Sequence, residues 1–160
     1  MNTSPKPIKR SSQLAPLSRE HHEGLLFGWK IKQGLRNGTD INLIAQFVQW
    51  YWQNHLQEHF TEEEHILAVH LPAADPLVQR MIEEHQGIEA LVHINANIAD
   101  EVLLAQLADD LNDHIRFEER EFFPYAERTL PAEALDHIYT QLSREKPSCS
   151  RWESEFWLKK

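Results

Sequence analysis

The sequence predicts an all-α protein, an up-down-up-down four-helix bundle with an extra short C-terminal helix and tail. Four long segments repeat apolar residues at helical spacing, and no stretch alternates apolar and polar residues as a half-buried strand does. The connections between these segments are short, which favours antiparallel neighbours. We expect a mobile leader over residues 1–13, the bundle over 14–128, and a C-terminal helix and tail over 129–160.

The first helix should begin near Pro16 or Ser18 and stop within 34–40, where glycine and asparagine interrupt the pattern. Its inward face passes through His21 rather than His22, which lies about 100° further round. Helix phase is poorly fixed by sequence, so both histidines stay candidates. The predicted inward residues are Leu14, Leu17, His21, Leu25, Gly28 and Leu35.

Polar residues and prolines mark the ends of the next helices. Asp40 or Asn42 is the expected N-cap of the second helix, because short polar side chains accept a hydrogen bond from a free backbone N–H. That helix should end before Pro72. Asp75 followed by Pro76 is a start signature for the third helix.

Pro124 should kink or end the fourth helix, since proline lacks a backbone N–H. Pro131 and residues 132–142 predict a shorter fifth helix. The inward residues expected on the second helix are Ile44, Val48, Tyr51 or Trp52, His55, His59, Glu63, Ile66 and His70. On the third and fourth helices they are Val78, Met81, His85, Ile88, Val92, Ala96, Leu104, Leu107, Leu111, His114, Glu118, Phe122 and Tyr125.

The composition excludes several classes of protein. The 160 residues fit one domain, and 16 Lys+Arg against 25 Asp+Glu give a net charge of -9, which disfavours nucleic acid and anionic membranes as partners. No apolar run approaches the roughly 20 residues of a spanning helix, and the N-terminus does not resemble a signal peptide. The single cysteine, Cys149, cannot form an internal disulfide, so we expect a cytoplasmic protein.

Two His-x-x-x-Glu pairs, His59 with Glu63 and His114 with Glu118, are the most informative feature of the chain. A four-residue step places both side chains on one helical face, about 6 Å apart. Imidazole nitrogen and carboxylate oxygen are ligands that borderline transition metals accept. Two further histidines on inward faces, His21 and His85, each directly follow a glutamate. We therefore predict a non-haem di-iron site held by His21, His59, Glu63, His85, His114 and Glu118.

Other interpretations of these residues are weaker. A ferritin-like site requires two Glu-x-x-His motifs, and only the one from Glu62 to His65 is present. A single zinc ion usually takes four ligands rather than six. Buried carboxylates without a cation would be costly. His55 lies one pair-step before His59, and a supporting or substitute-ligand role for it stays open.

The ligand motifs also point to a known family. They are the stretches Leu17 to His21, His59 to Glu63, Met81 to His85 and His114 to Glu118, followed by Phe122-Phe123-Pro124. Residues 14–128 resemble a hemerythrin-like, or HHE cation-binding, domain. The resemblance implies two irons bridged by two carboxylates and an oxo or hydroxo group, with a vacant position for dioxygen. Oxygen-carrying hemerythrins have a further histidine where this chain has Met81, so the resemblance does not imply dependable oxygen transport.

We expect the centre to bind dioxygen or a related small diatomic ligand, for sensing, redox defence or iron handling. A catalytic oxidase role stays open, but the sequence indicates no separate substrate pocket for it, which favours a protein that is not an enzyme. The alternative is a metal-stabilised structural module that binds a protein partner. Trp152, Phe156 and Trp157 in the tail can dock as one face of a short helix. They either cover the domain or form a homodimer or partner contact.

Overall fold

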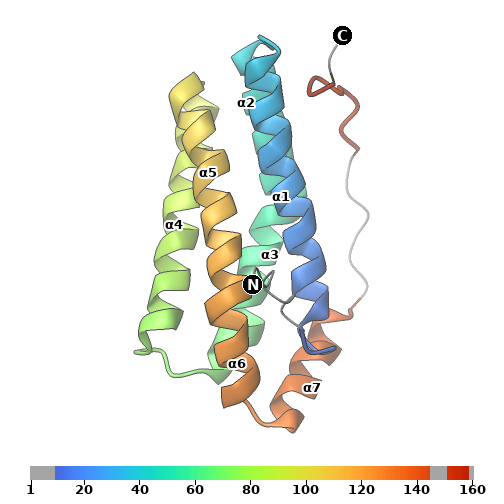
Figure 1. The fold of residues 1–160 in the computed structure, drawn as a ribbon, viewed down its shortest axis with the longest axis vertical. Coiled ribbons are helices and arrows are strands. Elements are labelled where there is room, and N and C mark those ends of the chain that lie inside the picture. Colours follow the sequence, from blue (N-terminus) through green and yellow to red (C-terminus); the bar gives the residue numbers. More distant parts are fainter. Residues whose placement is uncertain (1–9, 145–150, 159–160) are drawn as a thin grey trace, which may run out of the picture.

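The structure of the protein, a computed structural model, describes residues 10–144 and 151–158. All regular secondary structure within these residues is helical, and the long helices lie side by side as a bundle (Figure 1). No helix in this part of the chain is long and apolar enough to cross a membrane. The predicted all-helical class is confirmed. Residues 1–9 of the predicted leader, and Cys149, lie outside the described residues.

The bundle contains four long rods, and each lies where the sequence predicted a helix. The first rod is α1 (Ala15–Arg36), and the second is the unbroken run of α2 (Ile41–Tyr51), η1 (Trp52–Leu56), α3 (Gln57–Glu62), η2 (Glu63–Leu67) and η3 (Ala68–His70). The third rod is α4 (Pro76–Asn97), and the fourth is α5 (Glu101–Phe117), η4 (Glu118–Phe122) and α6 (Phe123–Thr129). The shorter fifth helix is α7 (Ala132–Leu142).

Aspartate side chains cap three of these rods. Asp40, Asp75 and Asp100 each accept a hydrogen bond from a backbone N–H of the first turn, at 2.8 to 2.9 Å. The caps at Asp40 and Asp75 were predicted. Of the two effects predicted for Pro124, a kink or an end of the helix, the end is wrong, because Pro124 lies in the first turn of α6, which follows η4 without a break. Its missing N–H is tolerated there.

Three segments, η1, η2 and η4, are π-helical. A π-turn holds more residues than an α-turn, so the buried face beyond it moves along the sequence. The prediction that His70 faces inward is therefore wrong, because His70 is exposed and Leu71, one residue further on, is buried instead. Ile66 is partly buried against apolar residues, and Leu67 beside it is fully buried.

Two other inward positions are also corrected. Leu25 of α1 is 39 % exposed, and Gly24 is buried in its place because the buried stripe advances by three residues here rather than four. In α4, Ala96 is exposed and Asn95 is buried. The Asn95 amide donates a hydrogen bond within its helix and accepts one from the backbone N–H of Asp100, which satisfies a buried polar side chain.

Two apolar clusters occupy the ends of the bundle. One lies toward the loops at 37–40 and 98–100, and the other is formed with α6 and α7. The tail at 151–158 has no helix, contrary to prediction, and lies against the first cluster. Phe156 is buried there, 5.2 Å from the ring of Phe47. A tail contact with a second copy or a protein partner stays a prediction.

Candidate metal centre

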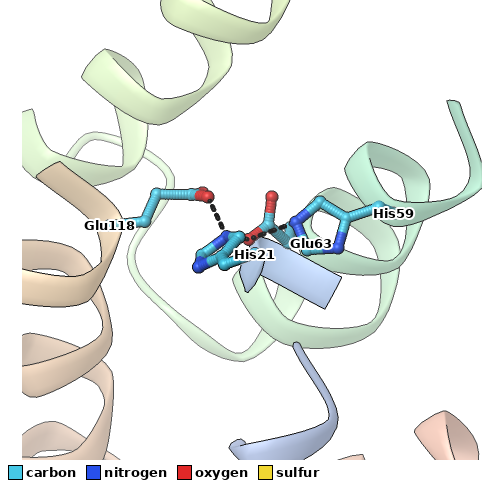
Figure 2. A group of neighbouring side chains, drawn as sticks. All are labelled: His21, His59, Glu63 and Glu118. Atoms are coloured by element: carbon cyan, nitrogen blue, oxygen red, sulfur yellow. Dashed lines mark hydrogen bonds and ion pairs between the residues drawn. The ribbon is translucent and has the colours of Figure 1, made fainter. Parts of the chain in front are cut away.

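Six polar side chains meet in the middle of the bundle, between the two apolar clusters. They come from all four rods, and each is 5 % exposed or less. Figure 2 shows four of them, His21, His59, Glu63 and Glu118, turned toward one another; His59 and Glu63 come from the same continuous helix. They are the six proposed ligands: His21 of α1, His59 of α3, Glu63 of η2, His85 of α4, His114 of α5 and Glu118 of η4.

These side chains form two overlapping groups. Within each group, one ligand atom from every residue lies within 4.8 Å of the others. Glu63 and Glu118 belong to both groups, while one group adds His21 and His59 and the other adds His85 and His114. Because a carboxylate has two oxygens, a shared glutamate can contact two cations at once. The arrangement suits two neighbouring ions.

His21, and not His22, takes part in the centre. His21 is buried, whereas His22 is exposed on another face of α1. The Nε2 atom of His21 lies 2.9 Å from Glu118 and 3.4 Å from Glu63. Both carboxylates beside this Nε2 atom are the shared glutamates, so His21 reaches the middle of the ligand group.

Both shared glutamates begin a π-turn, Glu63 at η2 and Glu118 at η4. Each also lies four residues after a ligand histidine, so the two side chains of each pair share one helical face. The Nε2 atom of His114 is 3.1 Å from Glu118. Single π-turns occur often at functional sites, because they re-aim side chains within an otherwise regular helix.

Without a cation, the imidazoles and carboxylates pair with each other. Burial and the Glu118 carboxylate raise the pKa of Glu63, but the nearby imidazoles of His59 and His21 outweigh them and lower that pKa to about 2. Burial lowers the pKa of His59, but the carboxylates of Glu63 and Glu20 raise it to about 9. The centre therefore combines buried groups of opposite charge.

These pairs leave part of the centre unsatisfied. The Nε2 atom of His59 is 3.3 Å from Glu63, close enough for attraction but not aligned for a hydrogen bond. Among the described residues, the buried atoms without a hydrogen-bond partner include His59 Nε2, His114 Nε2 and one oxygen each of Glu63 and Glu118. Such an atom costs about 1–3 kcal/mol. Bound metal would give these atoms a partner, so the residues fit a metal site.

A cavity of about 50 Å³ lies beside the centre. Since a water-sized molecule needs roughly 10–15 Å³ on this measure, the cavity has room for a few of them. Three ligand histidines line it, together with apolar side chains and the phenol ring of Tyr51. The lining residues are Glu20, His21, Glu23, Gly24, Tyr51, His55, Leu56, His59, Phe60, Leu111, His114 and Ile115.

Comparison with models of protein families identifies the family of this chain. The family model of the hemerythrin HHE cation binding domain matches residues 14–126, well over half of the sequence. The chain belongs to this family. Comparison with curated proteins and with solved structures gave no match. The predicted resemblance is thus confirmed, and the matched stretch contains all six residues of the centre.

The hemerythrin-like domain has Met81 one helical turn before His85. Met81 is fully buried, in the apolar cluster near α6 and α7, and belongs to neither ligand group of the described residues. An apolar side chain thus fills the position where oxygen-carrying members have a histidine. Each group in this domain has two histidines.

Sequence reasoning missed a second set of polar contacts around the hemerythrin-like centre. Glu62 is buried, and Glu64 contacts His85 at 2.7 Å. Glu84 similarly contacts His114 at 2.8 Å. The available signal was adjacency, because both glutamates lie next to a ligand in the sequence.

Proposed function

We propose that this hemerythrin-like domain holds two non-haem iron ions and binds dioxygen or a related small diatomic ligand beside them, for sensing, redox defence or iron handling. The observation that carries the proposal is the pair of buried ligand groups that share Glu63 and Glu118. When bound, the ions would supply one-electron redox chemistry and an exchangeable coordination position. His21 and His59 would hold one ion, and His85 and His114 the other.

The surroundings of the centre support a small ligand. The cavity is lined by His21, His59 and His114 but not by His85. A small ligand in the cavity would therefore reach the ion held by His21 and His59 more easily than the other ion. Its size admits molecules of a few atoms. The ring of Phe60 stacks on His85 at 3.8 Å and that of Phe123 on His21 at 5.1 Å, which restricts water at both imidazoles.

We also propose the up-down-up-down order for the bundle. Short connections at 37–40, 71–75 and 98–100 support it, because a short loop can only return the chain antiparallel to the previous rod (Figure 1). In that order, residues equally far from a loop lie at equal depth. His85 on the third rod then lies at the same depth in the bundle as His59 and Glu63 on the second rod.

Metal analysis with a visible spectrum in air tests the proposed function. Protein loaded with iron should contain two ions per chain, one for each ligand group, and its visible absorbance should change reversibly between air and an anaerobic reductant. Glu118→Ala removes a ligand of both ions, so its iron content should fall to near zero. His93→Ala is the control, since the His93 side chain is exposed, lies outside both ligand groups, and pairs with Glu89 on the surface of α4.

Circular dichroism shows whether each variant keeps its helices, so that iron loss is not confused with unfolding. Unchanged iron content in Glu118→Ala would contradict the assignment of Glu118 as a shared ligand. Native protein that takes up zinc in place of iron and stays colourless would contradict the redox function.

A further inference from the structure

Four half-buried glutamates surround the ligand histidines and belong to neither ligand group. Each has a carboxylate oxygen facing the Nδ1 atom of one histidine, and their side chains are 28 to 32 % exposed. We call these residues the outer carboxylates. The pairs are Glu64 with His85 at 2.7 Å, Glu84 with His114 at 2.8 Å, Glu119 with His21 at 3.1 Å, and Glu20 with His59 at 3.6 Å.

The two nitrogens of each ligand histidine thus have separate neighbours. In His85, for example, Nε2 lies 3.1 Å from Glu63 at the centre, while Nδ1 donates a hydrogen bond outward to Glu64. A histidine that binds metal through Nε2 carries its proton on Nδ1. A carboxylate that accepts this proton fixes the ring and makes the imidazole a stronger electron donor to the metal.

The outer carboxylates repeat with the ligands in the two halves of the chain. Glu20 and Glu84 directly precede the ligand histidines of α1 and α4, and Glu64 and Glu119 directly follow the two shared glutamates. Each ion would therefore have the same surroundings, with two imidazoles, the two shared carboxylates and two outer carboxylates.

The carboxylates give the surroundings of the centre an excess of negative charge. Two shared and four outer carboxylates carry six formal negative charges, and Arg80, 2.8 Å from Glu84, and Arg10, 3.9 Å from Glu119, offset part of them. The remaining negative charge attracts a trivalent ion more strongly than a divalent one. Because all these carboxylates are buried or half-buried, water screens them less than it screens surface charges.

We propose that the outer carboxylates bias the centre toward trivalent iron, so that the domain binds the oxidised pair of ions more tightly than the reduced pair. The inference rests on the proposed function, since it requires a bound iron pair. It adds to that function a set of positioning residues that act on the metal through its histidines.

The test is the reduction potential of the iron-loaded full chain, followed by its visible spectrum during a redox titration. Glu119→Gln and Glu64→Gln each remove one charge but keep a hydrogen-bond acceptor, and they act on different ions. A tenfold loss of preference for trivalent iron raises the potential by 59 mV for a one-electron step. We expect at least this shift from each variant.

Glu121→Gln is the matched control. Glu121 lies on the same π-turn as Glu119 and carries the same charge, but its side chain is 55 % exposed and faces Arg80. Its replacement should shift the potential much less. Glu20→Gln should give the smallest shift among the outer carboxylates, because its contact is the longest.

Shifts in Glu119→Gln and Glu64→Gln no larger than that of the control would overturn the proposal. Affinity for Zn²⁺, whose charge is fixed, is the independent readout, since loss of such a partner typically weakens metal binding 10–100-fold. Weaker Zn²⁺ binding with an unmoved potential would mean orientation alone and would also overturn it. Fewer than two irons in the native chain would defeat the proposed function itself, and this inference with it. If one variant fails to load iron, the other decides.

Discussion

His59 and Glu63 lie one helical turn apart, and each changes the ionisation of the other. The pKa of Glu63, about 2, lies below its ordinary 4.5, so its stabilising contribution is present above pH 4.5 and is lost as the pH falls toward 2. The pKa of His59, about 9, lies above its ordinary 6.5, so its contribution is present below pH 6.5 and is lost as the pH rises through 9. In the metal-free protein both contributions are complete only between pH 4.5 and 6.5.

Metal binding should therefore release protons well above the ordinary pKa of histidine. A ligand histidine must be neutral, and His59 is protonated at pH 7 in the metal-free protein. We expect the apparent affinity for Zn²⁺ to rise by up to about tenfold per pH unit, for each proton displaced, between pH 6.5 and 9. Competition with a chelator at several pH values measures this rise. An affinity that levels off above pH 6.5 would show that His59 has an ordinary pKa.

At the scale of the helix, the π-turns do more than carry the shared glutamates. Beyond η4 the buried residues are Phe123 and Ala126, and the predicted Tyr125 is only half-buried. The same displacement by one residue follows η2. Each π-turn therefore lets one rod direct both a ligand pair in its middle and apolar residues at its end toward the core. In a regular α-helix, residues at these positions would not lie on the same face.

The tail is held against α1 by close contact. A Cβ atom added at Gly34 would lie 2.7 Å from the ring of Phe156, whereas one added at Gly87 would meet nothing within 4 Å. Asn37 also donates hydrogen bonds to backbone carbonyls of the tail, including that of Phe156 at 3.3 Å. Helix α1 can carry this segment only because position 34 has no side chain.

Gly34→Ala and Gly87→Ala should consequently differ in stability. Alanine in a helix gains up to about 1 kcal/mol over glycine, so Gly87→Ala should stabilise the protein by about that amount. At Gly34 overpacking costs about 1–3 kcal/mol and should remove the gain or reverse it. Denaturant titration measures both free energies of unfolding. In a Phe156→Ala background, Gly34→Ala should become as favourable as Gly87→Ala. Equal effects of the two changes in the native chain would mean that the tail does not pack at Gly34.

Over the whole molecule, the sequence predicted what depends on spacing within one helix. The helix order, the aspartate caps and the six residues of the centre follow from steps of three or four residues and from local capping chemistry. The outer carboxylates do not, because Glu119 and His21 are 98 residues apart and meet only when two rods pack together. The π-turns have no comparable residue signature, so the faces beyond them could not be assigned from periodicity.

The centre lies between two apolar clusters, so the residues that stabilise the fold are largely different from those that would bind metal. Each cluster joins several rods through buried aliphatic and aromatic side chains, most of which pack away from the ligands. The centre between them contains two buried carboxylates that, without a cation, depend on imidazole partners. Burial of the two apolar clusters should keep the metal-free chain folded. Bound ions would add further stability, because they would link ligands from all four rods to one another.

Metal removal should thus lower the melting temperature without unfolding the protein at room temperature. An ion present at about 100 times its dissociation constant stabilises the native state by about 2.7 kcal/mol, which raises the melting temperature of a domain of this size by roughly 5–10 °C. Thermal circular dichroism of metal-free and iron- or zinc-loaded protein measures this difference. Glu118→Ala should show no shift when metal is added, because it lacks a ligand of both ions. A metal-free chain without helical signal at 25 °C would mean that the clusters alone cannot hold the bundle, and that the ions are part of folding itself.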